Sequence, residues 1–143
     1  MSEGNSMERT FAIIKPDAVA AGYSGAILSA VQDAGFLLSG MRLVRLTKVE
    51  AEGFYAVHRE RPFFDSLTNF MSSGPAIVMA LDAPDAILKW RALMGATDPA
   101  QAAEGTLRKR FGSSIEHNAT HGSDAPETAA FELGYFFRGV ELD

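Results

Sequence analysis

Two stretches near the amino end of the chain have the apolar pattern of β-strands. The run TFAIIK, which begins at Thr10, is apolar on both faces, so it predicts a central strand that ends at Pro16. The run FLLSGMRLVRL at 36–46 alternates over its second half and predicts a second strand. Between them, apolar residues at helical spacing predict an amphipathic helix that Ser24 caps and Gly35 ends.

The middle of the chain predicts two short helices followed by a strand. Thr47 and Glu50 have the spacing of a capping box, and the pattern favours a helix from there to about His58. Pro62 fits the first turn of another helix, PFFDSLTNFMSS. The run PAIVMAL at 75–81 is the most β-like in the chain and predicts the third strand.

The last third of the chain begins and ends with a helix. One helix is expected over 82–95, with Asp82 as its cap and Pro84 near its first turn. Residues 95–123 then contain four glycines and a proline with only short periodic pieces, and irregular segments of this length are often functional. The run ETAAFELGYFF at 127–137 predicts a closing helix, with room for a terminal strand after it.

The order of these elements favours an α+β fold over a doubly wound sheet, because helices do not separate the strands uniformly. A chain of 143 residues, 47% hydrophobic and 22% charged, suits one globular domain. We therefore expect a single domain over residues 1–143, in which the polar lead at 1–7 is frayed.

Charge and cysteine content limit which binding partners and metal sites the chain can have. The 13 Lys and Arg against 18 Asp and Glu leave a net charge of -5, which argues against binding nucleic acid by overall charge. The chain has no cysteine, which excludes disulfides and thiolate metal sites. The polar amino terminus lacks the apolar segment of a secretion signal, and no long apolar run follows, so we expect a cytoplasmic protein without membrane association.

His121 stands among some of the smallest side chains, in the stretch NATHGSDAPE at 118–127. We interpret these small neighbours as room for a substrate at the ring nitrogens. A neutral imidazole is a competent nucleophile near neutral pH, so His121 could carry a phosphoryl group, and Glu132 could orient its ring. The alternatives are a structural histidine with a satisfied hydrogen bond and a solvent-facing helix glutamate.

A metal site is a weaker alternative for the same histidine. His117 and His121 are four residues apart, and one face of a helix or strand could present both. A zinc site needs at least a third protein ligand, for which Asp124 is the only nearby candidate. We therefore expect no metal ion bound directly by protein side chains.

Basic and aromatic residues supply candidates for a nucleotide site, which must be built without a Walker loop or a Gly-rich dinucleotide motif. Lys15 ends an apolar strand, Arg91 lies in a predicted helix and Arg108 opens the run RKR; such cations could clamp a polyphosphate. A solvated helix face is the alternative for the RKR run. Phe63 could stack on a nucleobase, whereas core packing is preferred for Phe64.

Taken together, these stretches resemble the nucleoside diphosphate kinase family from about residue 8 to residue 137. The motifs that carry the resemblance are ERTFAIIKPDAV at 8–19, FYAVHRERPFF at 54–64, FMSSGPAIVMAL at 70–81, KWRALMGATDPAQAAEGTLRKRFG at 89–112 and SIEHNATHGSD at 114–124. Because they cover nearly the whole chain, the resemblance does not depend on one short pattern.

The resemblance implies a ferredoxin-like α+β sandwich: a four-stranded antiparallel sheet with helices on one side and a long loop at about 95–120. It also implies transfer of the terminal phosphate of a nucleoside triphosphate to a nucleoside diphosphate through a phosphohistidine, which maintains nucleoside triphosphate pools. Magnesium is expected on the nucleotide phosphates. Base and sugar selectivity should be low, and the chain should form a homo-oligomer, a hexamer or a tetramer built from dimers.

The resemblance also implies a role for individual residues. His121 would be the phosphorylated nucleophile and Glu132 the group that orients it, with Tyr55 and Ser123 lining the histidine. Nucleotide binding would involve Lys15 and Asn118 at the sugar, Phe63 at the base, and Arg91, Thr97 and Arg108 at the phosphates.

Departures from the family pattern are few. Ala125, Gly134 and Tyr135 differ from the commoner residues, and none has an assigned role; the final RGVELD cannot be matched. Two alternatives remain open. A catalytically silent nucleotide-binding module on the same fold is one, although the full set of site residues argues against it. The other is a nucleic-acid-binding protein that uses the RKR run, which the negative net charge disfavours.

Overall fold

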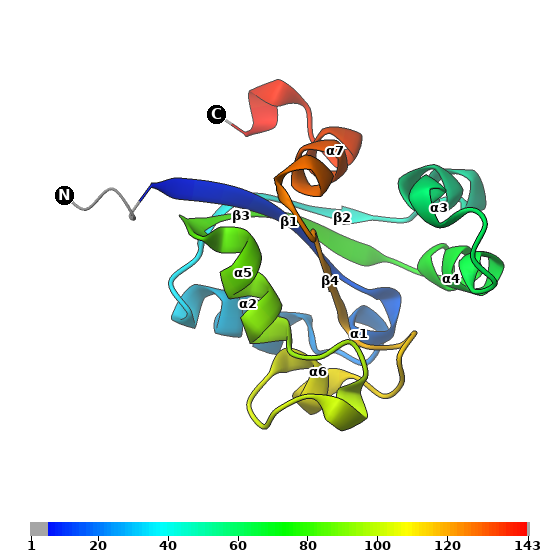
Figure 1. Ribbon diagram of the computed structural model, residues 1–143, viewed down its shortest axis with the longest axis horizontal. Coiled ribbons are helices and arrows are strands. Elements are labelled where there is room, and N and C mark those ends of the chain that lie inside the picture. The colour runs from blue at the N-terminus through cyan, green and yellow to red at the C-terminus, as the bar shows by residue number, and fades with distance from the viewer. Residues whose placement is uncertain (1–5, 143) are drawn as a thin grey trace.

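A computed structural model of the chain describes residues 6–142, and its centre is a four-stranded sheet. The strands are β1 (Met7–Ile14), β2 (Leu37–Val44), β3 (Ala76–Pro84) and β4 (Thr120–Gly122), in the order β2-β3-β1-β4 with every neighbouring pair antiparallel. The expected α+β sheet is therefore confirmed, with the apolar first strand in an interior position (Figure 1).

Seven α-helices and three 3-10 turns complete the described chain. The helices are α1 (Pro16–Ala20), α2 (Ser24–Asp33), α3 (Lys48–Phe54), α4 (Phe64–Met71), α5 (Ala86–Met94), α6 (Leu107–Phe111) and α7 (Pro126–Phe136), and the turns are η2 (Ala56–His58), η3 (Pro99–Gln101) and η4 (Gly139–Glu141). Within residues 6–142, no helix is long and apolar enough to cross a membrane.

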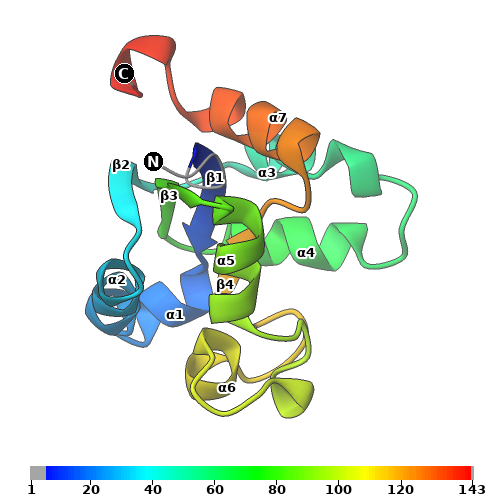
Figure 2. The same ribbon diagram turned by 60° about the vertical axis from the view of Figure 1, so that its left-hand side comes forward.

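Helices cover both faces of the sheet, whereas the resemblance implied helices on one side only. On β1, Ala12 and Ile14 belong to a core cluster completed by α1, α2, α5 and α6. Phe11 and Ile13 point the other way, into a second cluster formed with α3, α4 and α7 (Figures 1 and 2). The physical reason is that β1 is apolar on both faces, and each face must be removed from water.

Short-range signals predicted one helix start correctly and misplaced two others. The capping box is present: the Thr47 hydroxyl accepts from the Glu50 N–H at 3.1 Å, and Glu50 Oε1 accepts from the Thr47 N–H at 2.8 Å. The helix that follows ends at Phe54 rather than near His58 and is continued by η2. Ser24 is the first residue of α2 and not its cap, and Pro62 precedes α4, which begins only at Phe64.

Asp82 was expected to cap a helix, but it lies inside β3. Its carboxylate accepts from Arg9 Nε at 2.7 Å and Nη2 at 2.9 Å, and from the Ser39 hydroxyl at 2.6 Å. These contacts across three strands hold the residue in the sheet, so β3 continues to Pro84 and α5 starts at Ala86. The partner that decides the outcome, Arg9, is 73 positions away and leaves no local signal.

The irregular segment before the candidate histidine contains more structure than its pattern suggested. It includes η3, α6 and the three-residue strand β4, which pairs with β1 so that His121 lies opposite Ile13. Two other expectations change. A terminal strand is replaced by η4, and Met7 belongs to β1 rather than to a frayed lead; residues 1–5 of that lead lie outside the described part.

Candidate active site

A cleft of about 430 Å³ opens beside the end of β1, and eight of the ten predicted site residues line it. These eight are Lys15, Tyr55, Phe63, Arg91, Thr97, Arg108, Asn118 and His121. The other two, Ser123 and Glu132, lie behind the histidine and contact it or each other. The fold thus gathers residues from both ends and the middle of the chain into one site.

The imidazole of His121 is fixed by a buried carboxylate. Its Nε2 lies 3.0 Å from Glu132 Oε1, and the Ser123 hydroxyl donates to the same oxygen at 2.8 Å. The contact fits the tautomer in which the Nε2–H donates to the carboxylate, and in that tautomer Nδ1 keeps a free lone pair. Within residues 6–142, no hydrogen bond is made to Nδ1. Glu132 is only 6% exposed, which rules out a solvent-facing helix glutamate.

The small residues around His121 serve packing as well as space at the cleft. Ala119 and Thr120 are fully buried, and a side chain at Gly122 would collide with the ring of Trp90. The Trp90 Nε1–H also donates to the carbonyl of His121 at 3.1 Å. Ala119 and Thr120 therefore pack into the core, whereas Gly122 both packs against Trp90 and lines the cleft beside His121.

Lys15 and Asn118 form a buried polar pair on the cleft floor. Lys15 Nζ donates to Asn118 Oδ1 at 2.8 Å, and Asn118 Nδ2 donates to the carbonyl of Thr97 at 3.0 Å. Burial, and then the nearby charge of Arg108, lower the pKa of Lys15 to about 8. A lysine in this state is positively charged near neutral pH, and an anion bound beside it would stabilise that charge.

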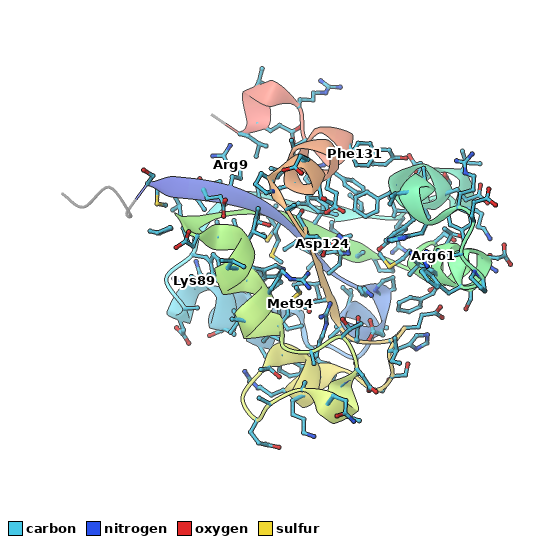
Figure 3. The ribbon with its side chains drawn as sticks, in the orientation of Figure 1. Arg9, Arg61, Lys89, Met94, Asp124 and Phe131 are labelled. Carbon is cyan, nitrogen blue, oxygen red and sulfur yellow. The ribbon has the colours of Figure 1, made fainter. Side chains whose placement is uncertain are left out.

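Two guanidinium groups line the cleft in different settings. Arg108 is buried, and it donates to the carbonyls of Gly95 at 3.1 Å and Thr120 at 2.9 Å. Burial, and then the charge of Arg91, lower its pKa to about 10, so it stays charged at neutral pH. Arg91 is more exposed and donates to Asp124 at 2.8 Å; Figure 3 shows Asp124 just after β4. Both cations are therefore available to phosphate oxygens.

The remaining predicted residues divide between the wall and the mouth of the cleft. The Tyr55 hydroxyl is buried without a hydrogen-bond partner in the described chain, and burial raises the pKa of its phenol. The Phe63 ring is 46% exposed and lies 5.6 Å from the ring of His58. Phe64 packs against the core instead, so core packing is confirmed for it.

The structure does not bring the proposed metal pair together. The ring of His117 stacks on Phe70 with centroids 4.2 Å apart, outside the cleft that His121 lines. Asp124 is paired with Arg91. Over residues 6–142, no group of three or more His, Asp or Glu side chains is placed to hold a metal ion. The cations that line the cleft, Lys15, Arg91 and Arg108, suit a phosphate ligand.

Several residues at the site gave no usable signal in the sequence. His58, Ile115 and Glu116 line the cleft, and Trp90 supports β4 from behind. In the RKR run, only Arg108 reaches the cleft, while the two following basic residues are exposed, as the solvated-face alternative predicts. Lys15 was identified because its charge interrupts an apolar strand. No comparable sequence signal identifies residues that act through the backbone of a loop.

Three cations around an imidazole that a carboxylate orients, with an aromatic ring at the mouth, give the cleft the chemistry of a nucleotide phosphotransferase. The chain matches the nucleoside diphosphate kinase family over residues 8–142. It is 62% identical over 136 residues to a nucleoside diphosphate kinase of Syntrophotalea carbinolica and 60% identical to one of Desulfovibrio desulfuricans, covering 95% of this chain and 99% and 98% of the relatives.

Solved structures give the same result. The nucleoside diphosphate kinase of Aquifex aeolicus superposes with a TM-score of 0.95 at 42% identity, covering 96% of this chain and 100% of the other. The enzyme of Halobacterium salinarum in complex with CDP gives 0.92 at 38% identity, covering 96% of this chain and 92% of the other. The chain belongs to the nucleoside diphosphate kinase family, and it is an enzyme that transfers phosphate between nucleotides.

Proposed function

We propose that the chain moves the γ-phosphate of a nucleoside triphosphate to a nucleoside diphosphate in two half-reactions that share His121. In the first, the Nδ1 lone pair forms a bond to the γ-phosphorus while the bond to the bridging oxygen of the β-phosphate breaks, and the diphosphate leaves. In the second, a β-phosphate oxygen of another diphosphate takes the group from Nδ1. The observation that carries the proposal is the 3.0 Å contact of Nε2 with buried Glu132, which leaves Nδ1 as the nucleophile.

The buried cations would stabilise the charge on the transferring group. Phosphoryl transfer depends mainly on positioning and on charge stabilisation. Arg91, Arg108 and Thr97 would bind phosphate oxygens, and their places on the cleft wall support this assignment. Tyr55 would line the histidine, and Ser123 would help Glu132 hold the ring, which its 2.8 Å hydrogen bond supports.

Sugar and base would be held with little selectivity. Lys15 and Asn118 would contact the ribose, because their polar groups meet on the cleft floor. Phe63 would stack on the base, and every base offers a π face to such a ring. A donor and an acceptor would therefore bind in the same way whatever the base, which suits an enzyme that maintains nucleoside triphosphate pools in the cytoplasm.

Magnesium would enter the site on the nucleotide. The cleft supplies cations rather than a cluster of carboxylates, so the phosphate oxygens themselves would provide most ligands. When bound there, the ion neutralises phosphate charge and orients the phosphate chain. Arg91, Arg108 and Lys15 would bind the oxygens that remain free.

We further propose that the chain forms a homo-oligomer, either a hexamer or a tetramer built from dimers. Leu37, Met41 and Leu43 are 60%, 49% and 65% exposed on β2, the edge strand of the described sheet, and this apolar surface supports an interface between copies of the chain. Sedimentation velocity at micromolar concentration distinguishes a hexamer, a tetramer and a monomer.

The test of the proposed function is direct. Incubation with ATP labelled at the γ-phosphate should give an acid-labile phosphoprotein, and added GDP should remove the label as GTP. His121→Ala should give no labelled protein and no transfer. Undiminished transfer by His121→Ala would contradict the proposal, and nucleotide binding without any labelling of the native chain would favour the silent module.

A further inference from the structure

The turn that leads into β4 contains a residue with a left-handed backbone. Ala119 has φ 75°, and among the non-glycine residues of the described chain only Asp85 shares a positive φ. The β-carbon of an L residue disfavours this region, which glycine adopts freely. Ala119 is also completely buried. The surrounding structure must therefore hold this residue in place.

The corner that follows β1 holds the backbone of Ala119 at two points. The carboxylate oxygen Oδ2 of Asp17 accepts from the Ala119 N–H at 3.1 Å, although the two residues are 102 positions apart. The Lys15 N–H donates to the carbonyl of Ala119 at 2.8 Å. Both contacts come from the same short stretch of chain, so the corner and the turn form one clamp.

This clamp lies between the sugar-binding pair and the candidate nucleophile. Asn118 precedes Ala119 and bonds to Lys15 Nζ, while His121 follows two residues later on β4. A change of φ at residue 119 would rotate the peptide groups on either side, so it would move Asn118 against Lys15 and alter the pairing of β4 with β1. Asp17 does not line the cleft, so it acts on a substrate indirectly, through this backbone and through its charge, which raises the pKa of Lys15.

We propose that Asp17 is a positioning residue, whose carboxylate keeps Ala119 in its left-handed conformation and thereby sets Asn118 and His121 in their productive places. The role of His121 in this statement rests on the proposed function. The second oxygen of Asp17, Oδ1, is buried without a partner in the described chain. Burying an oxygen in this way is unfavourable, and the contact that Oδ2 makes with Ala119 offsets part of that cost.

A double-substitution experiment separates positioning from general stability. Asp17→Ala should raise the KM for GDP and lower kcat in ATP-dependent transfer, with kcat/KM falling by about tenfold as the productive population shrinks. In that background, Ala119→Gly should recover at least about threefold, because glycine reaches the left-handed region without the clamp. Asp17→Asn keeps an acceptor oxygen and should lose only about threefold or less.

The controls exclude a purely structural explanation. Asp33→Ala removes an exposed carboxylate at the end of α2 and should leave kcat/KM unchanged. All assays run below the onset of unfolding, as measured by circular dichroism, because a structural role would lower the unfolding temperature without changing kcat/KM per folded molecule. If Asp17→Ala does not fold, the comparison is made with Asp17→Asn, whose loss Ala119→Gly should restore.

The proposal is overturned if folded Asp17→Ala keeps the native kcat/KM, or if Ala119→Gly fails to restore any of the loss. The result is independent of the chemical intermediate, since steady-state transfer is measured. A native chain that transfers phosphate without forming a phosphohistidine would contradict the proposed function, yet the rescue by Ala119→Gly would still test Asp17.

Discussion

The two ends of the cleft are built differently. At the floor, Lys15, Asn118 and Arg108 are 6%, 2% and 8% exposed and are held by hydrogen bonds to other protein groups. At the mouth, Phe63 and Ile115 are 46% and 61% exposed. The floor is held by protein hydrogen bonds before any ligand arrives, whereas the mouth offers mainly apolar surface, with His58 and Glu116 beside it. Discrimination should therefore be strict for the phosphates and weak for the base, and the sugar is held with little selectivity.

The strongest test of this contrast is at the floor. His121→Ala should lower kcat by at least about 10⁴-fold, because a nucleophile cannot be replaced by positioning alone. Steady-state transfer from ATP to GDP measures the loss. A smaller loss, of tenfold or less, would move the chemistry to another group. His117→Ala is the matched control, since this histidine stacks on Phe70 outside the cleft and should keep the native kcat.

Substitution of Glu132, the carboxylate behind His121, should have the second largest effect on kcat. Glu132→Ala removes the partner of Nε2, so the ring can rotate or take the wrong tautomer, and kcat should fall by about 100-fold. Glu127→Ala removes an exposed glutamate from the first turn of the same helix and serves as the control. Rapid-quench labelling with ATP should show that formation of the phosphoprotein is the slowed step. Equal effects of the two substitutions would refute an orienting role.

Titration of Lys15 should change the KM for nucleoside diphosphate by an intermediate amount, and the direction of the change with pH follows from its pKa. Its pKa is lowered from 10.5 to about 8, so the ammonium is charged below that pH and neutral above it. The KM for nucleoside diphosphate should rise above pH 8, by up to about tenfold per pH unit, and Lys15→Arg should remove this dependence.

The same lowered pKa predicts the opposite trend for stability. Between about pH 8 and 10.5 the unfolded chain binds more protons at this group than the folded chain, so the free energy of unfolding contributed by Lys15 rises with pH. Denaturant unfolding of the native chain and of Lys15→Met, at pH 8 and at pH 10.5, measures this contribution of Lys15 to the free energy of unfolding. Weaker nucleotide binding combined with greater stability at alkaline pH would separate the two effects.

The mouth of the cleft should tolerate substitution best. Phe63→Ala removes one stacking surface and should raise KM by roughly fivefold for all diphosphates alike, with kcat nearly unchanged. Phe131→Ala, which removes a similarly exposed ring on α7 (Figure 3), is the control. A loss confined to one base would show that the mouth reads base edges, and would break the contrast between floor and mouth.

The accuracy of the sequence-based predictions depended on how far away the deciding partner lies. Thr47 and Glu50 decide their helix start between themselves, so the capping box was predicted correctly. Asp82 has the local context of a helix cap, but Arg9 and Ser39 on neighbouring strands keep it in β3. The dependence on a distant partner also explains why β4 was not predicted. This strand is three residues long and is defined by its pairing with β1.

The site shows a similar division. The identities of its residues followed from the family resemblance, because motifs record chemistry directly. Their arrangement did not: the sequence left open which ring nitrogen of His121 is free, and the contact with Glu132 indicates Nδ1. The packing role of Gly122 was missed because Trp90, with which a side chain there would collide, lies on a distant part of the chain. Asp17 was missed since its effect runs through a peptide group of a distant turn.

The pairing of β4 with β1 has a consequence for how the chain acquires activity during folding. The contact between Lys15 and Asn118 spans 103 positions, and His121 contacts Glu132 from the last α-helix. Contacts of such long range close late and slowly, since the entropy of a large loop must be lost first. On the proposed mechanism, His121 is oriented only once Glu132 has reached it, so phosphoryl transfer is itself a probe of completed folding, and refolding followed by activity should lag behind refolding followed by helix formation.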